Sequence, residues 1–150
     1  MKQGDDGFRG DFSLLMKDNV PKASYNVLKM FNHLSGQWIE FTGTDDDVCG
    51  VAAWDKSKQR LAIVLVNYRD RYPLPRRVKL DVAELPAELQ QGSWREWLVD
   101  GTHSNVWHKR DDAELEQIDE GQVSGDSLVF QRTLEPNSVT LIEVLSSRGR

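Results

Sequence analysis

The sequence is poor in the residues and motifs on which several kinds of protein chemistry depend. Its 150 residues include one cysteine, Cys49, so no disulfide can form within the chain. Cys49 lies in an apolar run, residues 48–53, and we expect a small buried side chain there rather than a nucleophile. The sequence also lacks a Gly-rich phosphate loop, a Cys-x-x-Cys pair, a His-Glu-x-x-His motif and a Gly-x-Ser-x-Gly elbow. These absences remove the usual signatures of nucleotide-binding, redox, zinc-protease and serine-hydrolase families.

Neither an excess of positive charge nor a long apolar run is present. The net charge is −5, which disfavours nucleic acid as a partner because phosphate binding needs a basic surface. No apolar run approaches the ~20 residues of a membrane span, and no stretch has the layout of a signal peptide. We therefore expect a soluble protein without a membrane partner, with the cytoplasm as the favoured compartment.

One long helix is predicted over residues 21–36. Pro21 suits the first helical position, and Gly36 suits the left-handed residue that ends many helices. Apolar residues recur at helical spacing and cover more than one narrow stripe; they are Ala23, Tyr25, Val27, Leu28, Met30, Phe31 and Leu34. Such a helix needs apolar partners on more than one side, so we expect it to fold onto the rest of the chain or to pair with a second copy.

After Gly36 the apolar pattern changes to the period of β strands. Strands are predicted at residues 38–42, 48–54, 60–68, 77–82, 93–99, 127–133 and 138–145, with another at 12–16 before the helix. The strand at 60–68 is the most apolar and is expected at the centre of a sheet. Residues 100–125 are irregular, with one or two helical turns at 111–117. About eight strands with short turns indicate a mainly β fold, an antiparallel β-sandwich preceded by one long helix. The predicted units are residues 1–36 and the sandwich, 37–150.

A few side chains remain as candidates for binding. His103, Ser104 and Asn105 lie in the irregular segment and could hydrogen-bond a sugar or brace another domain. Exposed aromatic rings bind sugars, and Trp97 and Trp107 are candidates, although most tryptophans fill a core. Trp94 and Trp97 should point to opposite faces of their strand. His103 and His108 with nearby aspartates could form a metal site, but hydrogen-bonded structure is the simpler interpretation, and we predict no metal and no cofactor. Glu40 and Glu143, expected on outer strand faces, do not form a catalytic pair.

The order of several segments resembles the C-terminal part of family 39 glycoside hydrolases, the β-xylosidase and α-L-iduronidase group. The segments are residues 10–15, 21–28, 64–68, 100–107 and 135–143; the fourth reads Asp-Gly-Thr-His-Ser-Asn-Val-Trp. In this resemblance, residues 1–36 correspond to the last strand and helix of a (β/α)8 barrel, and the rest corresponds to the accessory sandwich.

The resemblance implies a non-catalytic domain. The family's acid/base and nucleophile glutamates lie on earlier barrel strands, which have no counterpart in this sequence, so no catalytic residue is assigned. A barrel needs ~200 residues or more, and about 36 precede the sandwich. We expect a sandwich that supports a catalytic barrel and its active-site rim, with that barrel as the partner. Two alternatives stay open: a free-standing carbohydrate-binding module that uses exposed aromatics, and a small metal-dependent enzyme that uses His103 and His108.

Overall fold

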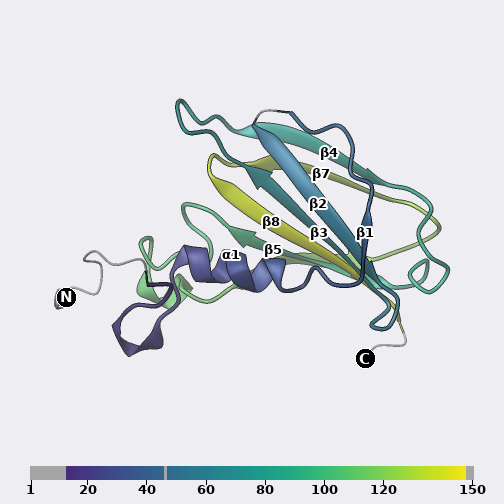
Figure 1. Cartoon of the computed structure of the whole chain (residues 1–150), viewed down its shortest axis with the longest axis horizontal. Coiled ribbons are helices and arrows are strands. Elements are labelled where there is room, and N and C mark those ends of the chain that lie inside the picture. Colours follow the sequence, from purple (N-terminus) through teal and green to yellow (C-terminus); the bar gives the residue numbers. More distant parts are fainter. Residues whose placement is uncertain (1–12, 46, 148–150) are drawn as a thin grey trace.

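The alternating segments of the sequence form a six-stranded antiparallel sheet. The structure is a computed structural model that describes residues 13–45 and 47–147 (Figure 1). The strands follow the order β1-β2-β3-β8-β5-β6; their bounds are β1 (Gln37–Ile39), β2 (Val48–Asp55), β3 (Arg60–Asn67), β8 (Ser138–Leu145), β5 (Ser93–Val99) and β6 (Glu116–Gln122). β3 lies between β2 and β8, and its residues from Leu61 to Leu65 are all buried. The prediction of a central strand here is confirmed.

A smaller sheet covers part of one face of the large sheet. It consists of β4 (Arg76–Val82) and β7 (Leu128–Leu134), which pair antiparallel. Its apolar side chains meet those of the large sheet in the main core, which contains Leu61, Ile63, Leu65, Phe130, Leu134, Ile142 and Val144. Val78, Leu80 and Val82 of β4 are half-buried against this core, on the face that their alternation predicts. Eight described strands in two antiparallel sheets confirm the predicted mainly β sandwich.

The opposite face of the large sheet carries helix α1 (Ala23–Phe31). Met30 is fully buried and packs with Ala62, Val64, Val99 and Leu141 in a second apolar cluster. The residues of α1 and its following turn that join this cluster recur at helical spacing, namely Ala23, Val27, Met30 and Leu34. The helix therefore folds onto the sandwich through one face (Figure 1).

The helix is shorter than predicted at both ends. Lys22 is its N-cap in an extended conformation, so Pro21 precedes the helix instead of opening it. At the other end the helix stops at Phe31. The carbonyl oxygen of His33, just beyond it, accepts a hydrogen bond from the Arg60 guanidinium at 2.8 Å. Gly36 has a φ of 89°, and a Cβ atom there would lie 2.2 Å from the Trp54 carbonyl oxygen. Gly36 thus lets the chain pass close to β2 rather than ending the helix.

Three other predictions are corrected. Described residues 13–16 form no strand: Leu15 makes an isolated bridge to Pro21, a 3-10 turn (Lys17–Asn19) follows, and Phe12 lies outside the described residues. The irregular region contains β6, preceded by a 3-10 turn at Arg110–Asp112 rather than by helical turns at 111–117. Cys49 is exposed, because it lies on the part of the outer face of the large sheet that α1 does not cover.

Candidate functional site

The segment that follows β5 is fixed by its own hydrogen bonds. The Asp100 carboxylate accepts hydrogen bonds from the backbone N–H groups of Thr102 and His103, both at 2.7 Å, and its Oδ1 lies 3.0 Å from His103 Nδ1. Burial raises the pKa of Asp100, but these hydrogen bonds outweigh burial and hold the pKa below its ordinary value. Asp100 is therefore an anionic anchor for this turn.

Ser104 and Asn105 continue this internal bonding. Ser104 is fully buried with a φ of 52°; its hydroxyl donates to the Leu98 carbonyl at 2.6 Å and accepts from the Glu116 N–H at 2.8 Å. The Asn105 amide donates to the Asp100 carbonyl at 3.0 Å. The polar atoms of both side chains form hydrogen bonds that stabilise the loop between β5 and β6.

A side chain of α1 that belongs to no sequence motif, Asn26, joins the helix to the same loop. Asn26 is fully buried, and its Nδ2 donates to the Ser104 carbonyl at 2.9 Å and to the Ala113 carbonyl at 2.6 Å. Asn26 lies on the same helix face as Ala23, Val27 and Met30, and this position in the sequence could have predicted its role. A polar residue buried on an apolar face needs hydrogen-bond partners elsewhere in the chain.

The predicted aromatic candidates are not neighbours in one site. Trp107 lies in the loop after β5 and is 63% exposed. Trp97 is half-buried in the cluster beneath α1, with its ring centroid 6.0 Å from that of His33. Trp94 packs on the opposite face of β5, edge-on to Phe130 at 5.0 Å, so the predicted division of Trp94 and Trp97 is confirmed. The loop thus brings His103, Ser104, Asn105 and Trp107 together without Trp97.

A cluster of charged residues joins the turn after α1 to the large sheet. His33 Nδ1 lies 2.5 Å from the Glu143 carboxylate, and Arg60 Nη1 lies 3.3 Å from it. Glu143 pairs with Ala62 and so lies on the outer, α1-bearing face of the large sheet, as predicted, but it is buried there because this turn covers it. No local pattern predicts this cluster, because His33 and Glu143 are 110 positions apart in the chain.

Asp55 makes a second connection between the same turn and the sheet. Its carboxylate accepts hydrogen bonds from the hydroxyl groups of Ser35 and Ser57, each at 2.6 Å, and from the Lys58 N–H. These hydrogen bonds, that of Ser35 foremost, hold the pKa of Asp55 well below its usual range. Asp55 therefore stays anionic over the whole physiological pH range.

Large apolar side chains are exposed on one flank of α1 and on β1, on the same face of the large sheet. Lys29 forms an ion pair with Glu114 on one flank of the helix, and Leu28 and Phe31 lie away from it, 51% and 41% exposed. Trp38 of β1 is 66% exposed; it pairs with Ala53, which pairs with Ala62 under α1, so Trp38 is on the same sheet face as the helix. We call Leu28, Phe31 and Trp38 the exposed flank.

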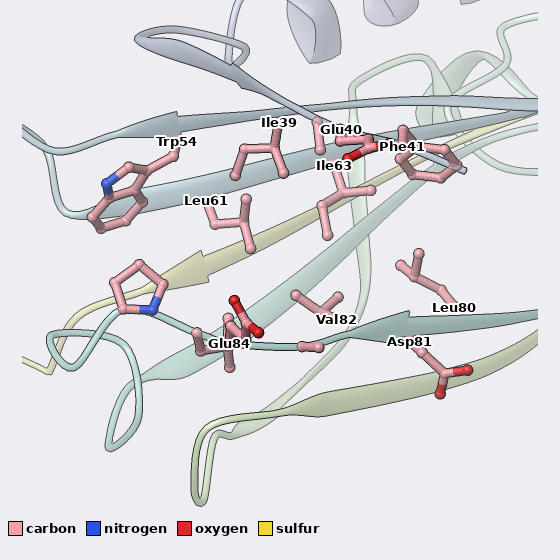
Figure 2. A pocket seen from close by; sticks show the side chains of 14 residues that line it. Ile39, Glu40, Phe41, Trp54, Leu61, Ile63, Leu80, Asp81, Val82 and Glu84 are labelled. Atoms are coloured by element: carbon pink, nitrogen blue, oxygen red, sulfur yellow. The ribbon is translucent and has the colours of Figure 1, made fainter. Parts of the chain in front are cut away.

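The other face of the large sheet has an open cleft at its β1 edge. The cleft has a volume of about 510 Å³ and lies between the chain at Ile39 to Phe41 and β4 with the residues that follow it (Figure 2). Its floor is apolar and comes from β2 and β3, through Ala52, Trp54, Leu61 and Ile63. An adjoining hollow of about 270 Å³ continues it along β4 to Val78.

The described part of the chain contains neither a metal-binding cluster nor a membrane-spanning helix. Residues 13–45 and 47–147 place no three His, Cys, Asp or Glu side chains together as a metal site, and His103 and His108 do not meet in one. No helix within the same residues has the length and apolar character to cross a membrane.

Comparisons with known proteins find the same fold in parts of larger solved structures. The sequence matches no protein-family model and no curated protein. Solved structures with a similar fold include the GH39 enzyme from Xanthomonas axonopodis pv. citri, with a TM-score of 0.75 and 12% identity over 93% of this chain and 33% of that one. A glucosidase from Croceicoccus marinus has a TM-score of 0.70 and 15% identity over 87% and 32% of the two chains. N2152 from Neocallimastix frontalis has a TM-score of 0.66 and 17% identity over 89% and 33%. At these identities the likeness shows a shared fold, and this chain spans about a third of the length of these proteins.

Proposed function

We propose that this chain is a non-catalytic accessory β-sandwich of a family 39-like glycoside hydrolase, and that it packs against the enzyme's catalytic barrel. The observation that carries the proposal is the exposed flank of Leu28, Phe31 and Trp38. Apolar side chains gathered on one face mark an interaction surface. The fold is that of part of larger proteins, which include glycoside hydrolases, and about two thirds of their length has no counterpart here. That missing part is the proposed cover of the flank.

The proposal assigns each segment a part in this contact. Residues 1–36, which include α1, are the last unit of the barrel, and residues 37–150 are the sandwich on which α1 packs. The loop with His103, Ser104 and Asn105 braces the barrel near its rim and does not bind sugar. Its polar atoms already form hydrogen bonds within the loop and to Asn26, so the loop is held in place and few of these atoms are left for a sugar. The acid/base and nucleophile carboxylates of the parent enzyme lie on its other barrel strands.

The coding sequence around these 150 codons tests the proposal. We expect a (β/α)8 barrel in the same frame, and glycosidase activity of the whole protein on nitrophenyl glycosides. In that whole protein, Leu28→Ser with Phe31→Ser should lower the thermal midpoint of the barrel. The matched variant Ser24→Ala, on the same exposed part of α1, should not. A frame without a barrel would overturn the proposal.

A second candidate is a carbohydrate-binding module, which the exposure of two aromatic side chains favours. Tyr72 is 85% exposed and Trp107 is 63% exposed, each in a loop at the same end of the strands. Affinity electrophoresis of the chain in gels with xylan and other glycans tests this candidate. Retardation that is lost in Trp107→Ala and Tyr72→Ala would favour it, and unchanged mobility in every glycan would remove it.

A further inference from the structure

The cleft at the β1 edge exists because the two sheets are unequal. β7 covers the β5 side of the large sheet: Phe130 of β7 packs on Trp94, and Arg132 Nε donates to the Glu96 carboxylate of β5 at 2.8 Å. β4 lies beside β7, and within the described residues no third strand continues the small sheet across β1 and β2. The apolar floor of the cleft is the part of the large sheet that such a strand would cover.

The cleft follows the free edge of β4. The cleft and the adjoining hollow share Glu40, Phe41, Leu80 and Asp81, and together they extend along β4 from Val78 to Val82 and on to Pro86. β4 pairs with β7 alone among the described strands, so the backbone groups on its other edge have no strand partner. An unpaired edge next to an apolar channel is the usual template for the addition of an extended peptide.

The inner side chains of β4 have the spacing that such a peptide needs. Val78, Leu80 and Val82 pack against the core. Figure 2 shows that the Asp81 side chain points away from the cleft. A strand paired to this edge would place every second side chain over the floor, beside Leu80 and Val82. The volume of about 510 Å³ has room for a few such side chains.

The rim of the cleft is acidic. Glu40 is exposed on the β1 side, and the Glu84 carboxylate turns from the end of β4 toward the cleft (Figure 2). The residues that line the cleft include no lysine or arginine. In the adjoining hollow, Lys79 binds Asp81 at 3.0 Å on the outer side of β4. This rim favours a ligand that carries positive charge at its polar positions.

We infer that the cleft binds an extended peptide strand that pairs with the free edge of β4. Its alternate apolar side chains enter the cleft, and its lysine or arginine side chains meet Glu40 and Glu84. The inference does not depend on the accessory role, since the cleft and α1 lie on opposite faces of the large sheet.

Two other occupants fit these observations less well. A second copy of the chain that paired β4 with β4 would bring two acidic rims together, and like charges across an interface oppose association. A small apolar cation would satisfy the charge and the floor but would leave the backbone groups of β4 unpaired. An added strand satisfies the floor, the edge and the charge together.

The experiment uses the whole chain and a capped heptapeptide that matches the length of β4, Lys-Val-Thr-Val-Lys-Val-Thr. Nuclear magnetic resonance titration should show saturable shifts of β4 amides, and hydrogen exchange should slow there. The peptide with glutamate in place of lysine should bind about tenfold more weakly. Peptides methylated on alternate backbone nitrogens, made in both registers, test the pairing, and at least one register should lose binding.

The matched variants separate this site from general charge attraction. Glu40→Arg with Glu84→Arg should weaken the basic peptide about tenfold, whereas Glu116→Arg with Glu120→Arg, on β6 at the opposite edge of the large sheet, should leave its affinity within about twofold. Circular dichroism confirms that each variant is folded. Equal loss in both double variants would overturn the inference, as would no saturable binding or full binding of both methylated peptides. Light scattering that shows a dimer with β4 protected would assign the edge to a second copy. If dodecylammonium displaces the peptide, and the peptide itself does not slow hydrogen exchange of the β4 amides, the cleft is a site for small cations and the inference is overturned.

Discussion

At the scale of single residues, buried amides hold segments that are distant in the sequence. Asn26 joins α1 to two carbonyl groups of the loop between β5 and β6. Asn67, at the end of β3, donates to the carbonyl groups of Leu74, Leu134 and Glu135 at 2.9 to 3.0 Å. Each amide donates to carbonyl groups that lie in loops or at a strand end, so each fixes the position of a loop on the sandwich.

Replacing Asn26 with alanine tests this role. The substitution leaves the carbonyls of Ser104 and Ala113 without their donor in a buried place, so the free energy of unfolding should fall by about 1–3 kcal/mol. Urea denaturation measures the loss, and hydrogen exchange should rise in residues 104–113. The control is Asn32→Ala, an exposed asparagine just after α1, which should change the free energy by less than about 0.5 kcal/mol. Equal effects of the two substitutions would contradict the prediction.

At the scale of elements, α1 has two apolar sides with different surroundings. The side with Met30 is enclosed by β3, β5 and β8, whereas the flank with Leu28 and Phe31 is exposed. A helix in a single sandwich needs only the first side. The second side is the feature that a larger assembly would use, and a second copy of the chain remains a predicted partner for it.

Two substitutions on the same helix separate these sides. Met30→Ala removes a fully buried side chain and should lower the free energy of unfolding by about 2–5 kcal/mol. Leu28→Ala removes a half-exposed side chain and should change it by less than about 1 kcal/mol. Thermal and urea unfolding of the isolated chain measure both. A loss in Leu28→Ala as large as that in Met30→Ala would mean that the flank is already covered, by self-association that light scattering would detect.

The elements that sequence predicts well are those whose pattern agrees with their surroundings. β3 is an apolar run because it is buried on both faces, and β4 alternates because one of its faces meets the core and the other is exposed. β6 was missed because this edge strand is polar, with Ile118 its one large apolar residue, and has no burial to shape its pattern. The exposure of Cys49 and the burial of Glu143 were not predicted, because alternation shows that two residues share a face but not which part of that face a helix and its turn cover.

At the scale of the whole molecule, anionic carboxylates lie at both ends of the large sheet, where Asp55 holds the turn after α1 and Asp100 holds the loop after β5. Asp55 lies where β2 turns into β3, and Asp100 lies beyond the opposite end, after β5. Both have a lowered pKa, because hydrogen bonds favour their charged forms. Glu96, in the core, has a raised pKa, because burial disfavours its charge more than Arg132 restores it. These groups act with opposite sign on stability in acid.

The sign of the acid response follows from these directions. A carboxyl whose pKa is lower in the folded state adds stability above its unfolded value of about 4, and this stability is lost as the pH falls through the folded value. A raised pKa, as in Glu96, gives the folded state an advantage as the pH falls, which offsets part of the loss. Thermal midpoints should therefore drop below pH ~4, less steeply in Asp55→Asn and more steeply in Glu96→Gln. Profiles of Asp55→Asn and Glu96→Gln that are identical to that of the unaltered chain would contradict the assignment.

The predicted site and the cleft differ in how far sequence could reach them. The segment with His103, Ser104 and Asn105 could be named because its residues are neighbours in the chain. The cleft joins residues from Ile39 to Pro86 and arises from the number of strands in each sheet, which no local pattern records. Glu40 and Glu84 acquire a shared role only through that topology.

The position of β8 has a consequence for how the protein is made. β8 pairs with β3 on one side and with β5 on the other, yet all seven other described strands precede it in the chain. On the ribosome, the β1-β2-β3 half and the β5-β6 half emerge first and have no direct pairing between them. The edge of β3 in one half and the edge of β5 in the other stay unpaired until β8 is synthesised. Synthesis therefore exposes the chain to aggregation longest between β3 and β8, and a chaperone that shields strand edges would help most in that interval.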